Sequence, residues 1–220
     1  MQQSSTVVIA GYGPAFGEAL ADRFRLGGYQ VIAVSRHGNW ATDLRDPAAT
    51  AVLFESIDRE AAPLAGVIHN AMEFHRQAFL ETNSDTFIRV WQSMVLTAVN
   101  VSQQAIPRLT KRGGGSLLFS GASGSVRAGA EFSAFSSAKF ALRGLAQSLA
   151  REHEADGIHV AHVVVDGLIR SERTAQRFAP PATAALIEPA DLAEQYFWLF
   201  QQRRSGWTHE IDVRPAPAAR

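Results

Sequence analysis

The chain has 220 residues, of which 46% are hydrophobic, and this is enough to bury the core of one globular domain. Its 21 basic and 21 acidic residues cancel, so its charge gives no sign of a nucleic-acid or acidic-membrane partner. The absence of cysteine excludes disulfides, thiolate metal sites and cysteine nucleophiles.

The sequence also lacks the marks of a membrane or secreted protein. No apolar run is long enough to span a bilayer, and no basic segment precedes Val7. We therefore expect a cytoplasmic protein that forms a single domain over residues 1–220. We expect no metal site, no nucleic-acid partner and no membrane partner.

The first informative stretch is apolar from Val7 to Ala10, turns through a glycine-rich segment, and continues as an amphipathic run to Leu26. A strand, a glycine turn and a helix start bind a pyrophosphate, because first-turn N–H groups are unpaired and the helix dipole is positive there. The alternative is an ordinary strand–helix turn. The candidate cofactor-binding residues of this turn are Gly11, Tyr12, Gly13, Pro14, Ala15, Phe16 and Gly17.

A second buried strand is predicted over residues 29–35, and it ends in Ser35, Arg36 and His37. In a dinucleotide-binding fold the adenosine ribose lies at this edge, where a carboxylate favours NAD. The sequence has no carboxylate here, and the fork of Arg36 suits a 2′-phosphate. NADP(H) is therefore favoured over NAD(H). The alternative is that Arg36 is a solvated surface residue.

The remaining chain alternates predicted strands and helices, separated by turns. The predicted strands lie at residues 41–44, 67–71, 116–120, 158–165 and 207–213, and the helices at 46–62, 83–109, 132–154 and 188–202. Residues 63–66 are predicted to be a turn, and residues 166–186 an irregular segment that acts as a lid. This alternation predicts a Rossmann-like, doubly wound α/β domain with a seven-stranded, mainly parallel sheet.

Taken in order, these motifs resemble the short-chain dehydrogenase/reductase family over nearly the whole chain. Residues 10–17 resemble its Thr-Gly-x-x-x-Gly-x-Gly turn, with Ala10 and Ala15 as replacements. Residues 69–72 resemble its Asn-Asn-Ala-Gly motif, and Asp166-Gly167 stands where the family usually has Pro-Gly. The resemblance implies further cofactor-binding residues, namely Asp43, Leu44, Asn70, Ala71, Lys139, Gly167 and Ile169.

The catalytic motif of the family is altered in this chain. Its Tyr-x-x-x-Lys falls on residues 135–139, so Phe135 replaces the tyrosine while Lys139 is kept, as in a divergent subgroup with Phe-x-x-x-Lys. The family's catalytic serine falls on Ala122 and its helix asparagine on Met94. The resemblance thus leaves Lys139 as a catalytic candidate, with Ser120 and Ser123, which flank Ala122, as substitutes for the missing hydroxyl.

Two functions are consistent with these residues. The first is an NADP(H)-dependent oxidoreductase that transfers hydride to or from a small carbonyl or alcohol substrate through an atypical site. The second is a non-catalytic NADP(H)-binding sensor, scaffold or partner protein, because Phe135 has no proton to exchange with a substrate. The two long helices at 85–109 and 132–154 resemble those that pair in the family's dimers, so a homodimer or homotetramer is expected. The alternative is that their broad apolar faces are buried inside one subunit.

Overall fold

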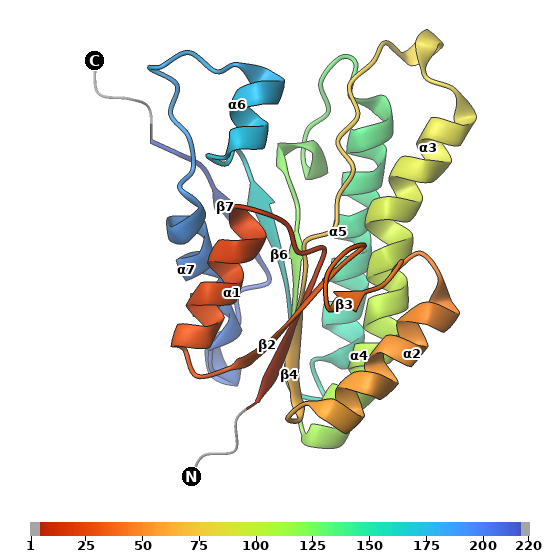
Figure 1. The fold of residues 1–220 in the computed structure, drawn as a ribbon, viewed down its shortest axis with the longest axis vertical. Helices are drawn as coiled ribbons and strands as arrows, with labels where there is room; N and C mark the ends of the chain where they lie inside the picture. The colour runs from red at the N-terminus through yellow and green to blue at the C-terminus, as the bar shows by residue number, and fades with distance from the viewer. Residues whose placement is uncertain (1–4, 217–220) are drawn as a thin grey trace.

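A computed structural model describes residues 5–216, and its centre is one parallel β-sheet with helices on both faces (Figure 1). The strand order is β3-β2-β1-β4-β5-β6-β7, and every neighbouring pair is parallel. The strands are β1 (Thr6–Ala10), β2 (Gln30–Ser35), β3 (Trp40–Ala41), β4 (Leu64–His69), β5 (Gly115–Ser120), β6 (Ile158–Val165) and β7 (Glu210–Val213). The predicted Rossmann-like fold class is confirmed.

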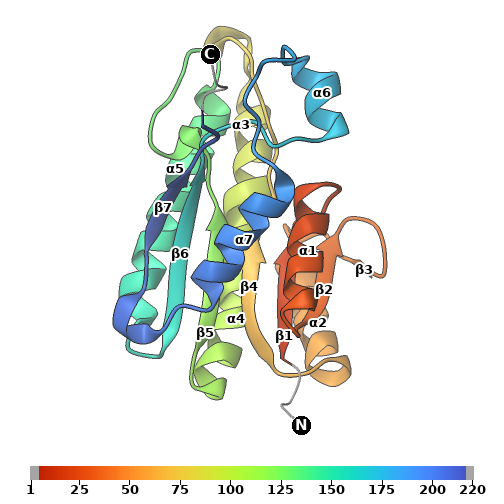
Figure 2. The same ribbon diagram turned by 90° about the vertical axis from the view of Figure 1, so that its left-hand side faces the viewer.

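The helices form two layers, which Figures 1 and 2 show from two sides. One face of the sheet is covered by α1 (Phe16–Leu26) and α7 (Pro189–Phe200). The other face is covered by α2 (Pro47–Glu60), α4 (Thr97–Arg112) and α5 (Ser133–His153). The short helices α3 (Ser84–Trp91) and α6 (Glu172–Phe178) complete the fold. None of the helices described is long and apolar enough to cross a membrane.

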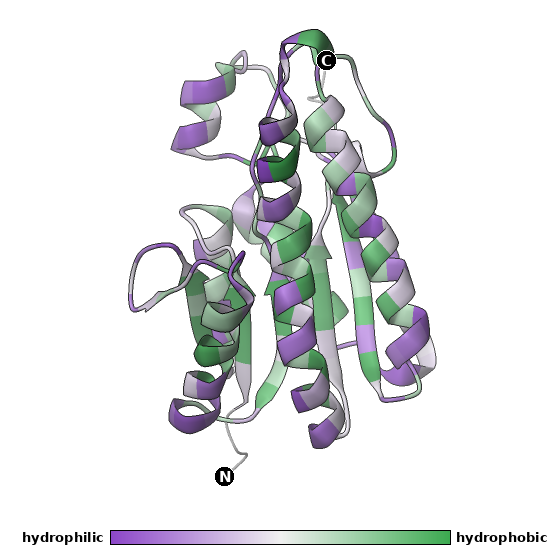
Figure 3. Ribbon diagram, turned by 90° about the vertical axis from the view of Figure 1, so that its right-hand side faces the viewer, coloured by the Kyte–Doolittle hydropathy of each residue, from purple (hydrophilic) through white to green (hydrophobic). Residues whose placement is uncertain are grey.

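Two hydrophobic cores lie between the sheet and these layers. The central strands β1 and β4 are buried along their whole length, as expected for strands covered on both faces. Figure 3 shows largely hydrophobic strands behind helices whose surfaces also carry hydrophilic residues. Because the carboxyl ends of parallel strands meet at one edge, the loops that follow β1, β2, β4, β5 and β6 gather there.

Three predicted strands have wrong boundaries. The seventh begins at Glu210 rather than at residue 207, after a short helical turn at Arg204–Gly206. The third strand pairs through Trp40 and Ala41 rather than over residues 41–44, since Asp43 leaves the ladder to pair with Arg45. The fourth strand begins at Leu64, so residues 64–66 extend the sheet rather than form a turn. Gly66 fits there because the Phe200 ring and a Ser116 carbonyl lie where its side chain would be.

The predicted helix over 83–109 begins with Asn83 as its cap, but a π-helical turn at Gln92–Leu96 separates α3 from α4. The Thr97 hydroxyl donates to the Ser93 carbonyl at 3.0 Å, where the backbone hydrogen bonds change register. A π turn inside a helix is uncommon and is frequent at functional sites. This one lies at the carboxyl edge of the sheet, beside His69.

The predicted irregular segment over 166–186 contains a helix that the sequence reading missed. The Ser171 hydroxyl accepts from the N–H of Thr174 at 3.0 Å and caps α6. None of the residues of α6 is buried, so the hydrophobic pattern that normally reveals a helix is absent.

Candidate active site

The turn between β1 and α1 has the geometry of a phosphate-binding loop. Gly11 has φ +89°, and a Cβ at that position would lie 2.3 Å from the backbone nitrogen of Ala71. A Cβ on Gly13, in contrast, would meet no other atom within 4 Å. In the described chain, hydrogen-bond acceptors are absent for the N–H groups of Gly13, Ala15, Phe16 and Gly17. An anion at the positive end of α1 would satisfy them, so these residues fit a pyrophosphate.

Ala15, the residue just before α1, is strained. Its φ of 64° and ψ of −94° lie in a region that residues with a side chain rarely adopt. The sequence places Ala15 where the resembled family has a glycine. The backbone therefore keeps a conformation suited to glycine although the residue has changed.

The end of β2 presents a cation at the carboxyl edge. The Ser35 hydroxyl donates to the His37 carbonyl and accepts from the N–H of His37 at 3.2 Å, so these two residues form a tight turn. Arg36, between them, is exposed and has no ion-pair partner in the described part of the chain. Its guanidinium is therefore available to a phosphate.

Asp43 and Leu44 lie beside this turn, and a second arginine accompanies them. Arg45 donates to the Asp43 carboxylate at 2.6 Å, which keeps the pKa of Asp43 below its usual value. Leu44 is buried, and the buried Asn100 amide of α4 donates to the carbonyls of Leu44 and Arg45 at 2.9 and 3.2 Å. The sequence reading missed Asn100, because an isolated asparagine in a helix gives no signal of what it holds.

The loop after β4 makes hydrogen bonds to the glycine turn between β1 and α1. The N–H of Asn70 donates to the Ala10 carbonyl at 2.7 Å, and its side-chain amide donates to the Gly11 carbonyl at 3.3 Å. Ala71 fills the space next to Gly11. Asn70 therefore fixes the position of the phosphate-binding turn.

Lys139 is the central cation of the site. It is 2% exposed, its Nζ donates to the Ser120 carbonyl at 2.7 Å, and burial lowers its pKa to about 8. The Phe135 ring, at the position of the family's tyrosine, lies 5.8 Å from Nζ and is itself buried. The Lys139 ammonium has two further N–H groups that can donate.

The two candidate serines lie in different places. The Ser120 hydroxyl accepts from the Tyr196 hydroxyl of α7 at 2.8 Å, on the sheet face opposite α5 and Lys139. Residues of a strand alternate between faces, and Phe119 rather than Ser120 faces α5. Ser123 follows β5 in a short helical turn and is half-buried, and only its carbonyl is engaged, by Val126 and Arg127. The Ser120 hydroxyl therefore points away from Lys139, and Ser120 would have to turn to replace the missing hydroxyl.

A row of three aromatic side chains crosses the sheet under the site. His69 of β4, Phe119 of β5 and His162 of β6 are cross-strand partners. Burial lowers the pKa of His69 to about 3 and that of His162 to about 4, so both rings are neutral at pH 7. His69 Nε2 lies 2.9 Å from the Thr97 hydroxyl, and His162 Nδ1 lies 2.9 Å from the Glu210 carboxylate.

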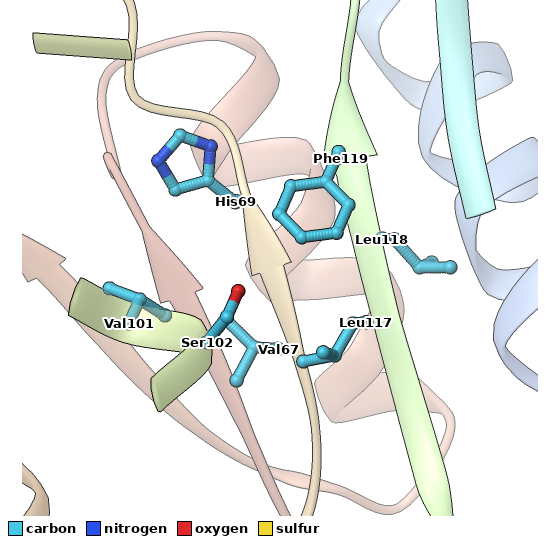
Figure 4. A pocket seen from close by; sticks show the side chains of 7 residues that line it. All are labelled: Val67, His69, Val101, Ser102, Leu117, Leu118 and Phe119. Atoms are coloured by element: carbon cyan, nitrogen blue, oxygen red, sulfur yellow. The ribbon is translucent and has the colours of Figure 1, made fainter. Parts of the chain in front are cut away.

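Below this row the interior holds a small gap, lined by the side chains that Figure 4 labels. The rings of His69 and Phe119 lie at one end of it and the Ser102 hydroxyl lies lower. The gap does not admit a water molecule, and the buried Ser102 hydroxyl has no partner in the described residues. It is a packing defect rather than a ligand site.

The segment after β6 borders the site from the other side. Asp166 accepts two hydrogen bonds at 2.8 Å from Arg127 of the loop after β5. Gly167 follows, and a Cβ there would lie 2.7 Å from the Pro215 ring. Ile169 forms a bridge with Ile187. The predicted cofactor residues Gly167 and Ile169 are thus at the sheet edge, in a loop tied to the loop after β5.

The site brings together a phosphate cradle, an exposed arginine and a buried lysine, and it lacks the family's tyrosine and serine. This arrangement can hold a dinucleotide along the carboxyl edge of the sheet. At its centre Phe135 and Ala122 have no exchangeable proton, whereas the Lys139 ammonium has one.

Comparison with known proteins finds relatives of this chain. The family model of short chain dehydrogenases matches residues 5–181. The 3alpha-hydroxysteroid dehydrogenase of Mediterraneibacter gnavus is 26% identical over 176 residues, which cover 76% of this chain and 70% of that protein.

Solved structures show the same fold. A short-chain dehydrogenase from Rhodopseudomonas palustris is 30% identical, with a TM-score of 0.82 over 96% of this chain and 99% of its own. An NADPH-bound short chain oxidoreductase from Pseudomonas aeruginosa, described as having an atypical catalytic center, has a TM-score of 0.87 over 95% of each chain. The latter is 17% identical, so it supports the fold alone.

Proposed function

This chain belongs to the short-chain dehydrogenase family, and on that premise we propose that it is an NADP(H)-dependent oxidoreductase. Its substrate would be a small carbonyl compound or the corresponding alcohol. In the reductive direction the carbonyl carbon gains a hydride and the oxygen gains a proton, which yields the alcohol.

The observation that carries this proposal is the set of unpaired N–H groups at the start of α1. A βα turn without a ligand role normally satisfies its first-turn donors with a side-chain cap, but Ala15 offers none. The open space at Gly13 leaves room for the phosphates. NADPH, when bound, supplies the hydride.

The preference for NADP(H) rests on the unpaired guanidinium of Arg36 at the end of β2. The NADPH-bound structure from Pseudomonas aeruginosa is consistent with this preference. The cysteine-free composition fits action in a reducing compartment such as the cytoplasm.

Lys139 and Ser123 would together replace the missing tyrosine, which in the family exchanges a proton with the substrate oxygen. Lys139 would bind the ribose of the cofactor and hold positive charge beside the reacting carbonyl. The Ser123 hydroxyl would donate to the oxygen as negative charge develops on it. A pKa of about 8 lets Lys139 Nζ release and regain a proton near neutral pH.

The first test is titration with NADPH and NADH, followed by energy transfer from tryptophan fluorescence. We expect NADPH to bind at least tenfold more tightly than NADH. Arg36→Ala should remove most of this preference, while Arg151→Ala, at the far end of α5, should leave it unchanged. Equal affinities for both nucleotides would contradict the NADP(H) assignment.

The second test separates an enzyme from a non-catalytic binding protein. NADPH oxidation is measured over a panel of aldehydes, ketones and quinones, with Lys139→Met and Ser123→Ala as variants. Turnover that falls at least a hundredfold in Lys139→Met supports the proposal. Tight NADPH binding with no turnover of any compound favours the sensor or scaffold function.

We also propose that the protein forms a homodimer or homotetramer through α3, α4 and α5. Large apolar side chains are exposed on α3 and α5, with Ile88 54%, Trp91 42% and Phe140 44% exposed. A second copy would bury them. Light scattering should give a molecular mass of at least two chains for the natural protein. The Phe140→Glu variant should have the molecular mass of one chain.

A further inference from the structure

A cluster of four phenylalanine rings lies directly beside the catalytic centre. The Phe74 ring lies 5.4 Å from that of Phe135, 5.8 Å from Phe132 and 5.2 Å from Phe178, centroid to centroid. The rings come from the loop after β4, the start of α5 and the end of α6. Aromatic rings gain from edge-to-face contact with another ring, so this cluster suits an aromatic guest.

Arg177 of α6 lies over this cluster and has no carboxylate partner in the described chain. Its guanidinium is 4.4 Å from the Phe74 centroid, and it donates to the Phe74 carbonyl at 3.2 Å. Three other arginines of the surrounding loops are neutralised: Arg76 by Glu131, Arg127 by Asp166 and Arg170 by Glu188. Arg177 therefore brings an uncompensated charge to the Phe74 end of the cluster, and Lys139 brings one to the Phe135 end.

Helix α6 is attached weakly to the rest of the molecule. None of its residues is buried, and its surface is mainly hydrophilic (Figure 3). It lies beyond the carboxyl edge of the sheet, above α1 and α7 (Figures 1 and 2). The contacts of Arg177 and Phe178 with Phe74 join it to the loop after β4. A guest that takes the place of the Phe178 ring on Phe74, while Arg177 stays over the cluster, would move the helix at little cost.

We propose that the substrate is a carbonyl compound with a one- or two-ring aromatic body and a carboxylate. The ring would pack on Phe74 and Phe135, and the carboxylate would bind the guanidinium of Arg177. This inference rests on the proposed oxidoreductase function and names the substrate class of the same site.

The geometry sets the orientation of such a molecule. Lys139 Nζ, the Phe135 ring, the Phe74 ring and the Arg177 guanidinium follow one another at separations of 5.8, 5.4 and 4.4 Å. The carbonyl would therefore lie at the Lys139 end and the carboxylate at the Arg177 end. A charge-assisted, bidentate contact with Arg177 would fix the register of the ring.

The test uses probes that cannot react, so it does not depend on turnover. 2-Naphthoate has both the ring and the carboxylate, 2-naphthamide has the ring alone, and hexanoate has the carboxylate alone. Calorimetric titration of the full chain saturated with NADPH should give 2-naphthoate at least a tenfold lower Kd than either of the others. Equal affinity for 2-naphthoate and 2-naphthamide would show that the carboxylate does not bind Arg177, and it would overturn this part of the proposal.

Three variants complete the test. Arg177→Gln should reduce the preference for 2-naphthoate over 2-naphthamide to less than twofold, while Arg173→Gln, an exposed arginine of the same helix, should preserve it. Phe74→Leu should weaken both naphthalene probes by a similar factor. An equal loss in the two arginine variants would overturn the assignment to Arg177.

The outcomes also separate this inference from the proposed function. NADPH binding and turnover with no binding of 2-naphthoate would refute the substrate class and leave the oxidoreductase intact. Arg177-dependent binding of 2-naphthoate with no turnover of any compound would support the aromatic-acid site and refute the enzyme.

Discussion

The buried ammonium of Lys139 should lower the free energy of unfolding of the protein. This chain has two lysines, Lys139 and the exposed Lys111 at the end of α4, so a matched pair of variants exists. A fall in the pKa of Lys139 from 10.5 to about 8 means that keeping it charged at pH 7 costs about 3 kcal/mol. Its hydrogen bond to the Ser120 carbonyl returns about 1.5–2 kcal/mol.

We therefore expect Lys139→Met to raise the free energy of unfolding by about 1 kcal/mol at pH 7, since methionine fills a similar volume without a charge. For a domain of this size, such a gain corresponds to a rise in Tm of roughly 2–4 °C. Lys111→Met should change the free energy of unfolding by less than about 0.5 kcal/mol. Urea unfolding without cofactor, followed by circular dichroism, measures both.

The pH dependence gives the sharper test. The folded protein releases the Lys139 proton near pH 8, and the unfolded chain releases it only near pH 10.5, so between these values the unfolded state binds more protons. The stability contribution of Lys139 therefore rises with pH across this window. Stability gains about 1.4 kcal/mol per pH unit in this window, so the advantage of Lys139→Met should shrink from pH 8 upward, vanish near pH 9 and reverse above it. A variant that is less stable than the natural chain at pH 7, or a difference that does not vary with pH, would refute the reasoning.

Three further changes have defined outcomes. Ala15→Gly should raise the free energy of unfolding by about 1 kcal/mol in urea, because it relieves a strained φ of 64°; a loss of stability would contradict that strain. Phe135→Tyr combined with Ala122→Ser restores the family's proton donors and should raise the rate of NADPH oxidation at least tenfold; an unchanged rate would show that the missing tyrosine does not limit this enzyme. Tyr196→Phe removes a donor to Ser120 and should cost about 1 kcal/mol of stability while NADPH affinity stays constant, and weaker NADPH binding would place that hydroxyl in the site.

The backbone geometry of the candidate cofactor site could be predicted from the sequence because its signals are local. A glycine turn between a strand and a helix fixes backbone geometry over a few residues, as the positive φ of Gly11 shows. Arg36 follows directly from the end of a strand, since strand ends in a parallel sheet share one edge. Asp46, as the cap of α2, is a signal of the same local kind.

The elements that the sequence reading missed have no local signal. α6 has no buried side, so its pattern resembles that of a loop. The π turn at Gln92–Leu96 lies next to Thr97 of α4, which contacts His69 of β4, a residue distant in the sequence. Which serine faces Lys139 depends on strand alternation, and counting from a motif placed Ser120 close to the site without giving its direction.

The sequence by itself determined the fold class, the glycine turn between β1 and α1 and the replacement of the family's tyrosine by Phe135, since each depends on residue type at a fixed spacing. The tertiary structure alone decided what surrounds Lys139. Burial by residues distant in the chain lowers its pKa, and packing brings Phe74, Phe135 and Phe178 from three separate segments into one cluster. Desolvation and aromatic contact depend on distances in space, and no short stretch of sequence specifies those distances.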